Sequence, residues 1–242
     1  MTDPRSGRLG IAAIVPAAGL GSRLGGPKLT LPLGGSTVLE RVVQGLVEGG
    51  VDPVLVVAPP ADRPWTDELI TCARRAGGTI ASLNHATTDM KATVAFGLGA
   101  IPRRPETAGV MIAPGDSVGV APSLVRAMIE RFELDRDKII IPSYQQKRGH
   151  PLLLPVSIAH LIADLAEDRG IDSLVRRFED RVIELAWSEV DAIADIDTPE
   201  DYERWRDRLS GSLEPRVDRS TGGLTDPSRR TDDSVPHRTQ YG

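Results

Sequence analysis

The sequence has little cysteine and no long apolar run. Cys72 is the only cysteine in 242 residues, which excludes an intramolecular disulfide framework and a zinc site built from cysteines. No apolar stretch approaches the roughly 18 residues that cross a membrane, and the opening MTDPRSGRLG lacks the apolar core of a signal peptide. These absences predict a cytoplasmic protein that has no membrane partner.

An excess of positive charge is also missing. The chain carries 29 Lys and Arg against 34 Asp and Glu, a net charge of -5 at pH 7, which argues against a nucleic-acid partner. Hydrophobic residues make up 40% of the chain, enough for one sizeable α/β core.

Short apolar runs alternate with amphipathic stretches along the first 142 residues. The amphipathic stretches have helical spacing, and Ser36 and Pro122 stand where two of the helices should begin. The apolar runs are predicted to be buried strands at 11–15, 54–59, 79–82, 109–116 and 138–142. The alternation predicts a doubly wound, mostly parallel α/β sheet in a single domain.

The composition changes at about residue 210. From there the chain is rich in Gly, Pro, Ser, Thr, Asp and Arg and has almost no aliphatic residues, so it cannot bury enough surface to offset its ordering entropy. We therefore expect a flexible N-terminus at 1–9, a folded domain at 10–209 and a disordered tail at 210–242.

The stretch IVPAAGLGSRLGGPK, residues 14–28, follows the first predicted strand. Its glycines allow backbone N–H groups to converge on an anion, while Arg23 and Lys28 supply positive charge. It is not a P-loop, because Pro27 and Leu29 flank the lysine, and the dinucleotide fingerprint fails at Leu24. The stretch predicts a different polyphosphate-binding loop.

Residues 16–35, PAAGLGSRLGGPKLTLPLGG, resemble the opening signature of the MobA-like nucleotidyltransferases. Four later segments stand in the order that the molybdenum branch of that family would give: GD at 115–116, RGHP at 148–151, DRGIDSLVRR at 168–177 and DIDTPEDYERW at 195–205. The chain is most similar to the molybdenum cofactor cytidylyltransferases of that branch. The resemblance implies the Rossmann-like fold of nucleotide-diphospho-sugar transferases.

The resemblance also implies a nucleotide site. Arg23 and Lys28 would act on the triphosphate charges as catalytic residues, together with Asp116. Ala18 favours CTP, since an Ala-Ala-Gly start is associated with cytidine nucleotides in this family. The residues implied for nucleotide binding are Ala17, Ala18, Gly19, Gly21, Ser22, Arg23, Lys28 and Thr93.

A metal site and an acceptor site follow from the same resemblance. Asp116 and Asp197 would hold Mg²⁺, and His150 with Arg148 would face the second substrate. Plainer roles stay open: Asp116 as a helix cap, Asp197 as part of an acidic helix start at Thr198, and Arg148 as a solvated loop charge.

The implied activity is Mg²⁺-dependent transfer of CMP from CTP to a phosphorylated acceptor, molybdopterin above all, with release of pyrophosphate. A phosphate monoester is already ionised at neutral pH, so this chemistry needs no general base. The alternatives are a GTP-using molybdopterin guanylyltransferase, a sugar- or alcohol-phosphate nucleotidyltransferase, and a non-catalytic nucleotide-binding or cofactor-chaperone module. The last is motivated by Val118, which stands where the molybdenum branch has proline. A molybdoenzyme or its chaperone is the expected protein partner.

Overall fold

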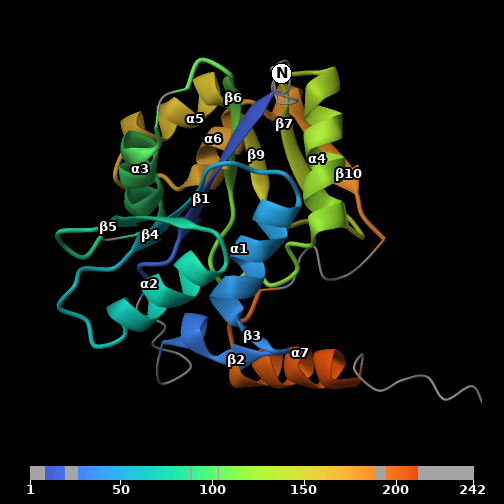
Figure 1. Ribbon diagram of the computed structural model, residues 1–242. Coiled ribbons are helices and arrows are strands. Elements are labelled where there is room, and N and C mark those ends of the chain that lie inside the picture. Colours follow the sequence, from blue (N-terminus) through green and yellow to red (C-terminus); the bar gives the residue numbers. More distant parts are fainter. Residues whose placement is uncertain (1–8, 20–26, 88, 103, 189–194, 212–242) are drawn as a thin grey trace, which may run out of the picture.

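A mixed sheet of eight strands forms the centre of the structure, a computed structural model that describes residues 9–19, 27–87, 89–102, 104–188 and 195–211 (Figure 1). The order across the sheet is β10-β7-β9-β6-β1-β4-β5, and β8 pairs with β7 at one side. The strands are β1 (Gly10–Pro16), β4 (Val54–Ala58), β5 (Thr79–Ser82), β6 (Thr107–Ile112), β7 (Ile139–Tyr144), β8 (Lys147–Arg148), β9 (Leu152–Pro155) and β10 (Val182–Ala186).

The sheet is mostly parallel, as the sequence predicts. β1 lies in its middle and pairs in parallel with β4 and β6, while β4 pairs in parallel with β5 and β7 with β10. The short β8 pairs antiparallel with β7, and β9 lies antiparallel between β6 and β7. This insertion brings the start of β9 to the edge at which β6 ends.

Helices cover both faces of the sheet (Figure 1). Those on one face are α1 (Val38–Glu48), α2 (Thr66–Arg75) and α4 (Pro122–Leu134). Those on the other are α3 (Met90–Ala100), α5 (Val156–Ala159) and α6 (Ile171–Arg177). The described residues also form short 3₁₀ turns at η2 (Lys28–Thr30), η3 (His160–Asp164) and η4 (Glu179–Arg181).

A small hairpin and the last helix lie together at one end of the molecule (Figure 1). The hairpin consists of β2 (Pro32–Leu33) and β3 (Ser36–Thr37), and the helix is α7 (Pro199–Gly211). The Tyr202 hydroxyl of α7 donates to the carbonyl oxygen of Pro32 at 2.6 Å. This contact ties the end of the described chain to the segment that follows the glycine-rich loop.

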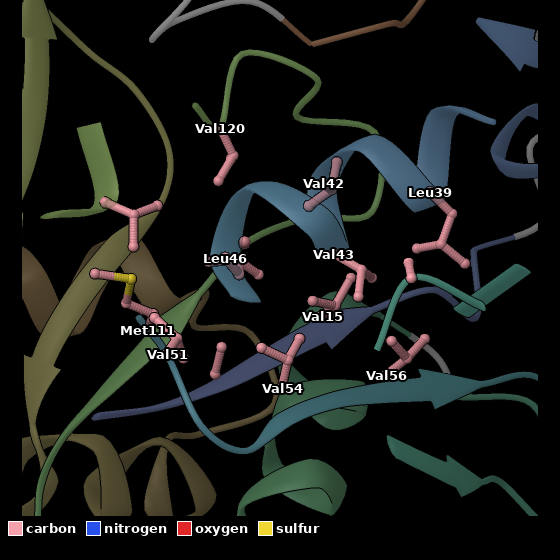
Figure 2. Packing of buried hydrophobic residues seen from close by; sticks show 14 of the residues in the cluster. Val15, Leu39, Val42, Val43, Leu46, Val51, Val54, Val56, Met111 and Val120 are labelled. Atoms are coloured by element: carbon pink, nitrogen blue, oxygen red, sulfur yellow. The ribbon is translucent and has the colours of Figure 1, made fainter. Parts of the chain in front are cut away.

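The core is built from strands whose alternate side chains face opposite helical layers. In β1, Val15 faces the layer of α1 and Ile14 faces that of α3, and both side chains are fully buried. Figure 2 shows the cluster of buried residues on the α1 side, in which side chains of α1 pack against those of β1, β4 and β6. Its labelled members on α1 and on the strands are Leu39, Val42, Val43, Leu46, Val15, Val54, Val56 and Met111.

Local signals place the helix starts, with one correction. Thr37, and not Ser36, caps α1: its hydroxyl accepts from the Glu40 N–H, and the Glu40 carboxylate accepts from the Thr37 N–H at 2.7 Å. Ser36 instead belongs to β3. Two hydrogen bonds in a capping box satisfy more of the helix end than a single serine cap could. Pro122 opens α4 as the sequence predicts.

The segment after β6 presses against α1 at a glycine. A Cβ on Gly45 would lie 1.9 Å from the carbonyl oxygen of Val120, closer than any side chain can come. Val118 and Val120 are themselves buried, and Val120 lies beside α1 (Figure 2). The position of the 113–121 segment therefore depends on the absence of a side chain at residue 45.

The predicted terminal segments, 1–9 and 210–242, lie almost wholly outside the described residues and stay predictions. The exceptions are Leu9 and the residues Ser210 and Gly211, which belong to α7, so the predicted start of the tail at residue 210 is two residues too early. In the part of the chain that the structure describes, no helix is long and apolar enough to cross a membrane.

Gly45→Ala is expected to displace the 113–121 segment. The clash with backbone should lower the free energy of unfolding by about 2 kcal/mol or more, which corresponds to a fall in Tm of about 4–8 °C. The matched control is Gly99→Ala in α3, where a Cβ would meet nothing within 4 Å. Ala is the better helix former, so the control should leave Tm unchanged or raise it. Equal Tm values for Gly45→Ala and the wild type would contradict the packing described.

Candidate active site

The carboxyl ends of β1 and β6 bring two distant segments together. The Gly115 N–H donates to the carbonyl oxygen of Pro16, the last residue of β1, at 3.3 Å. A Cβ on Gly115 would lie 3.2 Å from the Leu29 side chain. The residues after β6 therefore lie against both ends of the glycine-rich loop. In open α/β sheets this edge is where ligands bind.

Lys28 is the centre of a charged cluster at this edge. Its ammonium group forms an ion pair with Asp116, lies 3.5 Å from the Asp197 carboxylate, and donates to the Ile196 carbonyl oxygen at 2.8 Å. The Lys28 and Asp116 side chains are only 17% and 20% exposed, whereas Asp197 is 58% exposed. Three of the predicted site residues thus meet in space, and partial burial strengthens their attraction.

Two further hydrogen bonds join the segments that carry Asp116 and Asp197. The Ile196 N–H donates to the Asp116 carbonyl oxygen at 3.2 Å, and the Ser117 hydroxyl donates to the Asp195 carboxylate at 2.6 Å. Burial raises the pKa of the Asp195 carboxyl above its usual range, while the nearby His150 and the Ser117 hydroxyl act in the opposite direction. The sequence assigned no role to Ser117. The Asp-x-Asp spacing at 195–197 is the sequence signal that could have pointed to the contact between Ser117 and Asp195.

His150 reaches the same edge through the antiparallel strand. Because Ile112 pairs with Leu152 across β6 and β9, the residue two positions before Leu152 lies just beyond the end of β6. The imidazole lies close enough to Asp195 to influence its titration. The Nδ1 atom of His150 is buried and has no hydrogen-bond partner among the described residues. An unpaired buried ring nitrogen costs about 1–3 kcal/mol, so it is an open site for a ligand's polar group.

The first residues predicted for the nucleotide, Ala17 to Gly19, directly follow β1. Ala17 is buried, and its N–H donates to the Val57 carbonyl oxygen at 3.0 Å, whereas Gly19 is exposed. Gly21, Ser22 and Arg23 lie outside the described residues. The opening of the loop is thus placed at the sheet edge, and its central residues stay predictions.

Thr93 lies in the first turn of α3 with its hydroxyl already bonded. The Thr93 hydroxyl oxygen lies 2.6 Å from that of Thr87, and the Thr93 hydroxyl donates to the Asp89 carbonyl oxygen at 3.1 Å. The residue is 3% exposed. None of these contacts joins it to the Lys28 cluster, and its role at the base remains a prediction.

Arg148 forms ion pairs with two glutamates beside β10, at the end of the strand order opposite β5. Its guanidinium group donates to Glu184 at 2.8 Å and to Glu179 through two N–H groups. This bidentate contact raises the pKa of Arg148 and lowers the pKa of Glu179. The pairs link β8 to η4 and β10. A role toward the acceptor, which remains a prediction, would require a substrate anion to compete with two carboxylates.

The acidic segment after Asp197 has the capping role that the sequence offered as the plainer alternative. The Thr198 hydroxyl accepts from the Asp201 N–H at 3.2 Å, and the Asp201 carboxylate accepts from the Thr198 N–H at 2.9 Å. The same carboxylate accepts from the Asp197 N–H. Asp201 therefore fixes the start of α7, and the Asp197 side chain is left to face Lys28.

The two aspartates suit a hard divalent cation. Mg²⁺ is usually held by one or two carboxylates, with phosphate and water oxygens completing its coordination. Among the described residues no three acidic, histidine or cysteine side chains converge as a ready-made metal cage. Instead, one positive charge, the Lys28 ammonium, already lies between the carboxylates of Asp116 and Asp197. The donor set thus fits a cation that arrives together with phosphate ligands.

A separate hollow lies at the hairpin and α7. It measures about 490 Å³ and is lined by residues 32–37 with Arg75, Tyr202 and Arg206. None of the predicted site residues lines it. The candidate site is therefore located by the opposite charges of Lys28, Asp116 and Asp197 at the carboxyl edge of the sheet, and not by the size of this hollow.

Comparison with known proteins identifies the family. The model of the MobA-like NTP transferase domain matches residues 13–182, more than half of the chain. A curated relative, the 2-C-methyl-D-erythritol 4-phosphate cytidylyltransferase of Saccharopolyspora erythraea, is 26% identical over 180 residues, or 73% of each chain.

Solved structures share the fold. Rv0371c of Mycobacterium tuberculosis is 25% identical with a TM-score of 0.69, covering 82% of this chain and 98% of that one. A complex of the same protein with manganese has also been solved. A nucleotidyl transferase of Methanothermobacter is 24% identical with a TM-score of 0.71, covering 85% and 100%. With a family model that spans β1 to the start of β10 and a charged cluster at the carboxyl edge of the sheet, this chain belongs to the MobA-like NTP transferase family and is a nucleotidyltransferase.

Proposed function

We propose that this enzyme transfers CMP from CTP to a phosphorylated small molecule and releases pyrophosphate, with Mg²⁺ as the metal. The observation that carries the proposal is the position of Lys28 between Asp116 and Asp197 at the sheet edge. A lysine for phosphate charge and two carboxylates for a metal are the groups that nucleotidyl transfer requires.

Asp116 and Asp197 are the proposed metal-holding residues. Bound there with the triphosphate, Mg²⁺ supplies positive charge that neutralises the phosphate oxygens. The manganese complex of the Mycobacterium tuberculosis protein supports a divalent metal in this fold. Because the Lys28 ammonium pairs with the same carboxylates, it would be freed for the triphosphate when metal and nucleotide bind together.

In the proposed reaction an acceptor phosphate oxygen attacks the α-phosphorus of CTP. A new P–O bond forms, the bond to the bridging α,β-oxygen breaks, and pyrophosphate carries away the electron pair. The nucleophile is already ionised, so the residues of this chain position the groups and stabilise charge. Lys28, and Arg23 by resemblance, would hold the phosphates, and the Ala17–Gly19 segment would lie at the nucleotide.

Cytosine is the proposed base. Ala18 in the Ala-Ala-Gly start favours a cytidine nucleotide by family resemblance, and the curated relative from Saccharopolyspora erythraea is named as a cytidylyltransferase. GTP, as in a guanylyltransferase, is the alternative that a nucleotide comparison would separate.

Two candidate acceptors are each favoured by a different observation. The order of the later motifs favours molybdopterin, whose product would pass to a molybdoenzyme or its chaperone. The name of the curated relative favours an alcohol phosphate, 2-C-methyl-D-erythritol 4-phosphate. The buried Nδ1 of His150 supports a polar contact with either acceptor.

Lys28→Ala and Asp116→Asn are expected to lower kcat/KM by at least about tenfold, since each removes charge from the reacting phosphates. Steady-state pyrophosphate release measures the effect, and circular dichroism checks the fold. The matched controls are Lys138→Ala and Asp137→Asn, both just before β7 at the opposite edge of the sheet. Full activity in either site variant would refute the assignment.

CTP with Mg²⁺ is expected to raise Tm more than GTP, UTP or ATP. A ligand present at 100 times its dissociation constant stabilises the fold by about 2.7 kcal/mol, which a thermal-shift panel detects easily. A larger rise in Tm with GTP would refute the assignment of cytosine from Ala18.

Incubation with CTP, Mg²⁺ and one acceptor at a time should give one cytidylylated product detectable by mass spectrometry. Product with molybdopterin supports the first acceptor, and product with 2-C-methyl-D-erythritol 4-phosphate supports the second. Tight CTP binding without release of pyrophosphate from CTP in the presence of either acceptor would favour the non-catalytic alternative.

A further inference from the structure

The segments that carry Asp116 and Asp197 are 81 positions apart in sequence, and neither belongs to a helix or strand. Their separation therefore has to be fixed by contacts between loops. One contact is between backbone groups, from the Ile196 N–H to the Asp116 carbonyl oxygen at 3.2 Å. A second joins two side chains, from the Ser117 hydroxyl to the Asp195 carboxylate at 2.6 Å, beside the Lys28 ammonium that contacts both segments.

The side-chain contact is sheltered from water. Ser117 is 2% exposed, and Asp195 is half-buried. A carboxylate out of water is costly unless hydrogen bonds compensate it. The structure nevertheless keeps Asp195 at the site, next to two other aspartates. The hydrogen bond from Ser117 offsets part of that cost and links the two segments without either residue touching the substrate.

The segment of Ser117 is anchored on its other side as well. The Val118 N–H donates to the Asp116 carbonyl oxygen at 2.9 Å, and the Val120 N–H to that of Ser117 at 3.1 Å. Val118 and Val120 are buried, and Val120 lies against Gly45 of α1. The turn that presents Asp116 is thus held by α1 on one side and by Asp195 on the other.

We propose that Ser117 and Asp195 are positioning residues that set the distance between the carboxylates of Asp116 and Asp197 for the metal. Ser117 follows Asp116 directly and Asp195 lies two positions before Asp197, so their hydrogen bond fixes both segments at once. This inference rests on the proposed function, because it needs Asp116 and Asp197 to hold a cation. Neither Ser117 nor Asp195 is itself assigned to the metal.

The test measures Mn²⁺ binding in the presence of a non-hydrolysable CTP analogue. The water-proton relaxation rate reports the bound Mn²⁺. Ser117→Ala is expected to weaken Mn²⁺ binding about tenfold, the usual effect of losing a hydrogen bond that orients a metal ligand. Ser117→Thr keeps the hydroxyl, and Asp195→Asn keeps an oxygen acceptor. Both should stay within about threefold of the wild type, with Tm measured for every variant.

A double variant separates positioning from direct ligation. If the pair acts as one unit, Ser117→Ala combined with Asp195→Ala should bind Mn²⁺ no more weakly than Asp195→Ala alone. Wild-type affinity in Ser117→Ala would overturn the proposal. So would an Asp195→Asn variant as weak as Asp195→Ala, because that pattern belongs to a metal ligand.

The same Mn²⁺ titration distinguishes failure of the proposed metal site from failure of the positioning role. If the wild-type protein binds no Mn²⁺ with the nucleotide analogue, the metal role of Asp116 and Asp197 fails, and the positioning role fails with it. If the wild type binds and Asp116→Asn does not, while Ser117→Ala binds normally, only the positioning role is wrong.

Discussion

The ammonium group of Lys28 between two aspartates is the interaction on which the site depends. Lys28 comes from the end of the glycine-rich loop, Asp116 from the turn after β6, and Asp197 from the segment before α7. Without the lysine, two carboxylates would face each other across a partly buried space, and like charges at such a distance repel. The lysine makes the arrangement stable in the absence of ligand and leaves it ready for another cation.

The sheet supplies the geometry for this meeting. β1 and β6 are parallel neighbours, so the loops that follow them emerge at the same edge. The antiparallel β9 adds His150 to that edge from a segment that would otherwise lie on the opposite side. The close approach at Gly45 then holds the turn of Asp116 against α1. Packing in the core thereby fixes the position of charges at the surface.

Much of this arrangement follows from the sequence, because buried strands and their following loops have strong local patterns. The alternating segments predict the parallel sheet, and the glycine-rich loop with Lys28 predicts phosphate chemistry. Other features depend on pairings that no local pattern encodes. The insertion of β9 between β6 and β7 is one, and the two carboxylate partners of Arg148 are another. The sequence assigned no role to Ser117, and only its three-dimensional contact with Asp195 gives it one.

The most direct test of the account is a crystal structure with Mn²⁺ and a non-hydrolysable CTP analogue, using anomalous scattering to locate the metal. The account predicts an Mn²⁺ peak between the carboxylates of Asp116 and Asp197, with the Lys28 ammonium moved onto the triphosphate. A peak elsewhere, with Lys28 still paired to Asp116 and the nucleotide bound away from this edge, would contradict it.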